Sequence, residues 1–180
     1  MKKMKVFRIN SRHLQERVNW LNKPEIYSFL NMQYPIDIEQ TQKWYEKITK
    51  DSSRIDFVFS QDNDVVAMTG LTSLDLQNQL VEFYIFVNPE FQGRGFGKKA
   101  TVFSLNWAFT NYNINKIYLY TNDFNTKAND LYIKLGFELE GKLRQHKFKD
   151  GKNIDRCIYG LLRNDWEKMP YSTTNIQLEI

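Results

Sequence analysis

The stretch that decides the fold is Val81–Phe109, which reads VEFYIFVNPEFQGRGFGKKATVFSLNWAF. It starts as an apolar strand, breaks at Asn88-Pro89, passes three glycines and then becomes helical. Glycines between a strand and a helix let a ligand approach the backbone closely, and the start of the helix supplies unpaired N–H groups with a partial positive charge. This combination suits a phosphate group, although a flexible turn is the simpler reading of the glycines alone.

Hydrophobic periodicity along the rest of the chain predicts one α/β (α+β) domain. The predicted order is β-α-α-β-β-β-α-β-α-β-β, which gives a mixed, largely antiparallel sheet flanked by helices. The final two strands form a hairpin that turns at Asp150-Gly151. The predicted elements are residues 4–10, 11–22, 38–50, 54–60, 65–74, 80–87, 98–113, 116–122, 125–136 and the hairpin 137–162.

The spacing of the glycines excludes two nucleotide-binding motifs. A P-loop requires G-x-x-x-x-G-K-[ST], which the residues after Gly93 do not match. A dinucleotide fingerprint requires a third glycine at the place where Lys98 stands. The pattern that remains is Gln92-x-x-Gly95-x-Gly97, with a strand before it and a helix after it.

This pattern resembles the acetyl-CoA signature Q/R-x-x-G-x-G/A of the GNAT acetyltransferase superfamily, here QGRGFG. Residues 125–141, NTKANDLYIKLGFELEG, are similar to the second signature of that superfamily, with an Asn before a helix, then an Ala, a Tyr and a closing Gly-Phe. The resemblance covers nearly the whole chain and is greatest to the branch with spermidine, ribosomal-protein N-terminal and amino-sugar acetyltransferases. It implies a single acetyltransferase domain over residues 1–170, followed by a tail at 171–180.

The resemblance implies that acetyl-CoA is the co-substrate. Its pyrophosphate would lie on backbone N–H groups of the glycine loop, and its pantetheine arm would run along the end of the preceding strand. Asn125 would hydrogen-bond that arm or cap the following helix, and Arg94 and Lys98 could equally be solvated surface charges. The implied donor-binding residues are Ile85, Phe86, Val87, Gln92, Gly93, Arg94, Gly95, Phe96, Gly97, Lys98 and Asn125.

Transfer of an acetyl group from a thioester to an amine needs a neutral amine, a polarised carbonyl and a proton for the departing thiolate. The resemblance implies that Tyr132 supplies this proton, whereas its helical spacing alone would make it a core residue. Glu82 lies on an apolar strand, on the same face as Tyr84 and Phe86. There it could act as a general base, directly or through a water, or pair with a basic neighbour.

Composition restricts the partners. A chain of 180 residues with 42% hydrophobic residues suits one core, and it has neither an 18-residue apolar run nor an apolar signal core. We therefore expect a cytoplasmic protein without a membrane span. One cysteine and two separated histidines predict no metal site. Residues 91–180 carry 14 Lys/Arg against 9 Asp/Glu, but no nucleic-acid motif accompanies this bias, so we do not expect nucleic acid as a partner.

These observations predict an N-acetyltransferase whose acceptor is a primary amine of a small molecule, an amino sugar, a polyamine or a protein N-terminus. The amine would attack the thioester directly, without a covalent acyl-enzyme. The resemblance implies that residues 21–44 shape the acceptor site, and the few carboxylates of this segment do not indicate a polyamine. The alternative is a non-catalytic module that binds acetyl-CoA. The resemblance also implies a homodimer, with the C-terminal strands as the candidate interface.

Overall fold

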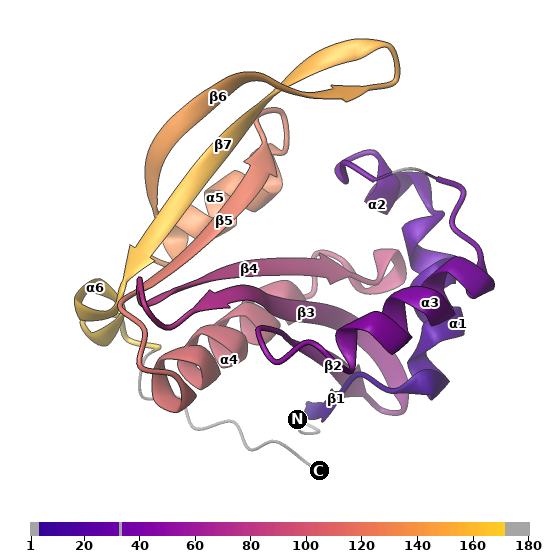
Figure 1. The fold of residues 1–180 in the computed structure, drawn as a ribbon, viewed down its shortest axis with the longest axis horizontal. Helices are drawn as coiled ribbons and strands as arrows, with labels where there is room; N and C mark the ends of the chain where they lie inside the picture. Colours follow the sequence, from indigo (N-terminus) through magenta and orange to yellow (C-terminus); the bar gives the residue numbers. More distant parts are fainter. Residues whose placement is uncertain (1–3, 33, 172–180) are drawn as a thin grey trace.

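The computed structural model describes residues 4–32 and 34–171, which form a seven-stranded sheet with helices on both faces (Figure 1). The strand order is β1-β2-β3-β4-β5-β7-β6, and every neighbouring pair is antiparallel except β4 and β5. The predicted mixed, largely antiparallel sheet is therefore confirmed. The strands are β1 (Lys5–Arg8), β2 (Ile55–Gln61), β3 (Asp64–Asp75), β4 (Leu80–Val87), β5 (Lys116–Asn122), β6 (Glu138–Lys149) and β7 (Lys152–Leu162).

The helices lie in the connections between the strands, in the predicted order. Two short helices were not predicted: α2, which begins at Pro24, and α6, which directly follows β7. Proline suits the first turn of a helix because its fixed φ is already helical. The helices are α1 (Leu14–Leu21), α2 (Pro24–Tyr27), α3 (Ile38–Ile48), α4 (Phe96–Asn111), α5 (Thr126–Lys134) and α6 (Arg163–Glu167), with 3₁₀ turns at Ser11–His13 and Pro89–Phe91.

Alternation along β4 directs its side chains into two apolar cores, one on each face of the sheet. Phe83 belongs to the core shared with α4 and α5, and Phe86 to the core shared with α1 and α2. Tyr132 of α5 and Leu135, the C-cap residue of that helix, pack into the first of these cores. Helices α1 to α3 therefore cover the opposite face from α4 and α5 (Figure 1).

The parallel strands β4 and β5 separate along their length. Leu80–Glu82 of β4 pairs with Lys116–Tyr118 of β5, and beyond this point the two strands diverge (Figure 1). The second half of β4, which ends at Val87, therefore borders an opening in the sheet. Residues from both faces of the sheet can reach this opening.

Two expectations from the sequence concern membrane-spanning helices and the C-terminal tail. None of the described helices is long and apolar enough to cross a membrane. Of the predicted tail at 171–180, all residues except Tyr171 lie outside the part of the chain that the structure describes. The boundary between domain and tail therefore stays a prediction.

Candidate active site

A cavity of about 860 Å³ occupies the opening between β4 and β5. One part of its wall is the second half of β4, the glycine loop and the first residues of α5. The other part comes from the segment of α1 to α3 and from Arg54, which directly precedes β2. The cavity thus brings both sequence signatures, at Gln92–Gly97 and at 125–141, to one space.

The glycine loop has the geometry that an oxyanion site needs. Gly93 and Gly95 have φ angles of +77° and +81°, and a Cβ atom at either position would meet no other atom within 4 Å. At Gly97 a Cβ atom would lie only 3.1 Å from Cγ2 of Val87, so glycine permits the close packing of α4 on β4. The loop therefore adopts a backbone conformation that favours glycine and leaves open space beside it.

The N-terminus of α4 is free to bind an anion. Gly95 is its N-cap and offers no side-chain oxygen to the first turn, and that turn contains no acidic residue. The N–H groups of this 16-residue helix and its partial positive charge are therefore not compensated by its own side chains. These features fit the pyrophosphate of acetyl-CoA.

Most of the predicted donor-binding residues line the cavity, but Arg94 and Phe96 do not. The Arg94 guanidinium lies 5.0 Å from the centre of the Phe91 ring, and Phe96 packs edge-on against the same ring. Lys98 lines the cavity and also donates a 2.9 Å hydrogen bond to the hydroxyl of Tyr171. The predicted donor-binding residues that line the cavity are Ile85, Phe86, Val87, Gln92, Gly93, Gly95, Gly97, Lys98 and Asn125.

Asn125 occupies the N-cap position of α5 but does not cap the helix with its side chain. The capping alternative is therefore wrong. The side chain lines the cavity instead, on the side where the pantetheine arm is expected.

Tyr132 lines the cavity from α5 and is only 6% exposed. Its ring packs edge-on against Phe137, with the ring centres 5.6 Å apart. Burial raises the pKa of the phenol above its ordinary value. The hydroxyl therefore keeps its proton at physiological pH, as a proton donor must. Tyr132 therefore packs in the core and also contacts the cavity, so the two roles considered for it are compatible.

Glu82 does not line the cavity. It forms the last β4 pair with β5, opposite Tyr118, where the opening between the strands closes. Burial raises the pKa of its carboxyl group, while the charges of Arg156 and Arg54 lower it. A role as general base through a water stays a prediction, and the position also fits the alternative of a carboxylate that balances basic neighbours.

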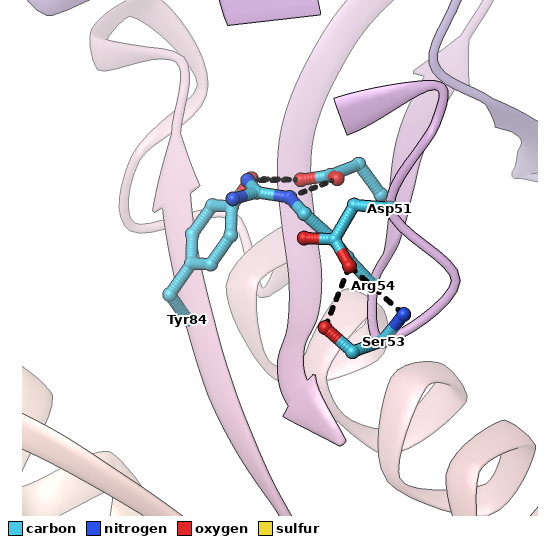
Figure 2. Close-up of polar contacts among 5 residues, drawn as sticks. Asp51, Ser53, Arg54 and Tyr84 are labelled. Carbon is cyan, nitrogen blue, oxygen red and sulfur yellow. Dashed lines mark hydrogen bonds and ion pairs between the residues drawn. The ribbon is translucent and has the colours of Figure 1, made fainter. Parts of the chain in front are cut away.

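A half-buried polar group borders the other side of the cavity through Arg54 and Tyr84. Figure 2 shows its hydrogen bonds. Arg54 donates to both carboxylate oxygens of Asp56, at 2.6 and 2.8 Å, and to the Tyr84 hydroxyl at 3.2 Å. The Tyr84 hydroxyl in turn donates to Asp56. Burial, followed by the charge of Asp56, raises the pKa of Tyr84. The ring of Tyr84 lies over Gly70 of β3, where a Cβ atom would overlap it.

Arg17 of α1 completes this wall. Its guanidinium lies 3.9 Å from the centre of the Trp44 ring, and Arg54 lies 5.2 Å from the same ring. We call Arg17, Trp44, Arg54, Asp56 and Tyr84 the arginine cluster. Within the described part of the chain, Nε and Nη1 of Arg17 are buried without a hydrogen-bond partner.

The sequence analysis did not single out the arginine cluster. Its members come from α1, α3, the start of β2, and β4, so no local pattern joins them. One signal was available, because Arg17 follows Leu14 by three positions and precedes Leu21 by four. It therefore stands on the apolar stripe of α1, where a charged residue is unexpected.

Comparison with known proteins identifies the class. Residues 6–138 match the acetyltransferase (GNAT) domain family. Spermidine N(1)-acetyltransferase of Escherichia coli is 33% identical over 118 residues, which are 64% of this chain and 63% of that enzyme. Acetyltransferase PseH of Campylobacter jejuni is 28% identical over 140 residues, or 77% of this chain and 86% of PseH. The chain thus matches less than two thirds of the length of the Escherichia coli relative.

Solved structures give the same family. Spermidine N-acetyltransferase of Vibrio cholerae, in complex with CoA and spermine, superposes with a TM-score of 0.87 and 25% identity, covering 92% of this chain and 99% of that chain. The chain therefore belongs to the GNAT acetyltransferase family. The predicted family and branch are confirmed, and with them, at the level of the family, the enzyme class and acetyl-CoA as co-substrate.

Proposed function

We propose that this protein transfers the acetyl group of acetyl-CoA to a primary amine by direct attack. The observation that carries the proposal is the shared cavity, which joins the uncapped start of α4, the free end of β4 and the buried phenol of Tyr132. The glycine loop and α4 would bind the pyrophosphate, and Ile85–Val87 and Asn125 would hold the pantetheine arm.

Two proton transfers accompany the reaction. The nitrogen lone pair of the amine forms a bond to the carbonyl carbon, the carbon–sulfur bond breaks, and the nitrogen loses one proton while the sulfur gains one. Tyr132 would supply the proton to sulfur, because a phenol kept neutral by burial can donate to a thiolate. Glu82 would receive the proton of the amine through a water, since its side chain does not line the cavity.

The composition of the cavity wall bears on the acceptor. Spermidine is named as the substrate of several relatives. Among the described residues that line this cavity there is one carboxylate, Glu25, whereas Arg17, Arg54, Lys98 and Lys127 are cationic. A polycationic acceptor needs carboxylates around it, so this wall favours a less cationic amine, such as an amino sugar, another small molecule or a protein N-terminus.

Two measurements test the proposal. Calorimetry with acetyl-CoA measures donor binding, and no binding at about millimolar concentration would contradict it. A free-thiol assay with a panel of amines then measures transfer. Thiol release that depends on the amine supports an enzyme, whereas binding of acetyl-CoA without release for any amine supports the alternative of a non-catalytic binding module.

We also propose that the protein is cytoplasmic and forms a homodimer through its C-terminal strands. β6 lies at the edge of the sheet, and its apolar residues Leu139 and Phe148 are 56% and 74% exposed. Exposed apolar residues on an edge strand favour association with another chain. Sedimentation that detects a monomer alone at micromolar protein would remove the dimer proposal.

A further inference from the structure

The acceptor side of the cavity contains a buried arginine, and two of its three guanidinium nitrogens have no hydrogen-bond partner among the described residues. Arg17 is 6% exposed and lines the cavity, and its Nε and Nη1 atoms have no partner among the described residues. Trp44 and Phe86 cover the guanidinium at 3.9 and 5.0 Å from their ring centres. Aromatic rings can hold a guanidinium, but they do not replace the hydrogen bonds that a buried charge needs.

The charges of the arginine cluster also leave one cation in excess. Asp56 compensates Arg54 through two hydrogen bonds, and the phenol of Tyr84 is neutral. Arg17 adds a second cation without a second carboxylate in the cluster. Two further carboxylates lie near Arg54, but each also has a second cation beside it: Lys47 for Asp51, and Arg156 for Glu82. These additional pairs therefore leave the balance positive.

We infer that Arg17 binds an oxyanion, a carboxylate or a phosphate, carried by the amine acceptor. The planar guanidinium presents its N–H groups in a fork that matches either anion. The inference rests on the proposed function, because it concerns the acceptor of that reaction. It makes the acceptor an amine that also bears a negative charge, such as an amino acid or a phosphorylated amino sugar.

Matched pairs of amines test this inference by activity. Glucosamine is compared with glucosamine 6-phosphate, and hexylamine with 6-aminohexanoate, while spermidine serves as the cationic comparison. We expect kcat/KM to be at least about tenfold higher for the anionic member of one pair, as one charge-assisted hydrogen bond would give. The pair that shows the preference identifies the oxyanion as phosphate or carboxylate.

Two variants assign the preference to Arg17. In Arg17→Met the anionic and neutral members should differ by less than about threefold, because the anion has lost its partner. Arg12→Met is the matched control, since it removes an exposed arginine five positions earlier and should keep the full preference. Unfolding temperature and acetyl-CoA affinity, measured for both variants, verify that each folds and binds the donor.

A binding measurement makes the inference independent of turnover. Inorganic phosphate and acetate are titrated into the protein with saturating CoA, which occupies the anion site at the start of α4, and binding by the wild type should be lost in Arg17→Met. No binding of either anion at about 10 mM, or equal binding by both proteins, would overturn the inference. So would a preference for spermidine over every anionic amine. Acetyl-CoA binding without thiol release for any amine would instead reject the proposed function, because anion binding by Arg17 is measured separately.

Discussion

At the scale of single residues, Tyr132 combines core packing with contact to the cavity. Tyr132→Phe removes the hydroxyl but keeps the ring that packs on Phe137. If the phenol protonates the CoA thiolate, kcat should fall by roughly 10²–10⁴, while acetyl-CoA affinity and unfolding temperature stay close to those of the wild type. Tyr159→Phe is the control, since Tyr159 is 3% exposed and does not line the cavity. Near-full turnover in Tyr132→Phe would contradict the proposed mechanism.

The ionisation of Tyr132 gives a prediction about pH. Burial raises the pKa of its phenol above the ordinary value of about 10, so the proton required for catalysis is still present at pH 9. We expect kcat at saturating substrates to show no alkaline decrease due to this residue between about pH 7 and pH 10. A decrease within that range that disappears in Tyr132→Phe would show that the pKa is not raised.

Arg17 should reduce the stability of the protein. Burying a guanidinium whose Nε and Nη1 atoms have no partner among the described residues costs several kcal/mol, whereas its contact with Trp44 returns only about 1–2 kcal/mol. Arg17→Met has a side chain of similar length without charge, and we expect it to raise the unfolding temperature by about 2–4 °C for each kcal/mol gained. Thermal unfolding without ligands measures this effect. A lower unfolding temperature would mean that Arg17 is satisfied within the folded chain.

At the scale of elements, the glycine loop allows a paired test of conformation and binding. Gly95 and Gly151 both have positive φ angles, +81° and +77°, and open space around the Cβ position. Alanine at either site should therefore cost about 1–2 kcal/mol of stability. Gly95→Ala should in addition weaken acetyl-CoA binding by about 10–100-fold, because its methyl group would keep the pyrophosphate from the N–H groups of α4. Equal affinities in calorimetry would contradict this role.

Local signals predicted most of the elements and part of the site. Three glycines in QGRGFG and the helical spacing that contains Tyr132 lie within short segments, so sequence periodicity and turn chemistry could identify them. The arginine cluster could not be found in this way, because Arg17 and Tyr84 meet only after α1 folds onto the sheet. The position of Glu82 was predicted on the correct face of β4. Its distance from the cavity depends on where β4 and β5 separate, which no local pattern specifies.

At the scale of the whole molecule, bound acetyl-CoA should contact both β4 and α5. These two parts of the chain are otherwise joined, at the backbone, through the short pairing of β4 with β5. The cavity wall includes β4 and α5, while the pairing of β4 with β5 covers Leu80–Glu82. At 100 times its dissociation constant, acetyl-CoA should stabilise the fold by about 2.7 kcal/mol. For a chain of this length that raises the unfolding temperature by about 5–10 °C. Gly95→Ala should show a smaller shift at the same concentration, and no shift in the wild type would contradict donor binding.

The place of α1 to α3 in the chain has a consequence for how such proteins diversify. These helices lie between β1 and β2, and the two strands are hydrogen-bonded neighbours with Arg8 opposite Phe57. The segment between them therefore leaves the sheet and returns to it at almost the same point. It can be exchanged for a segment of another length or composition without moving the glycine loop or Tyr132. Under the proposed function, the part of the acceptor side that includes Arg17 and Trp44 can thus change by replacement of one contiguous piece, while Asp56 and Tyr84 stay on the sheet.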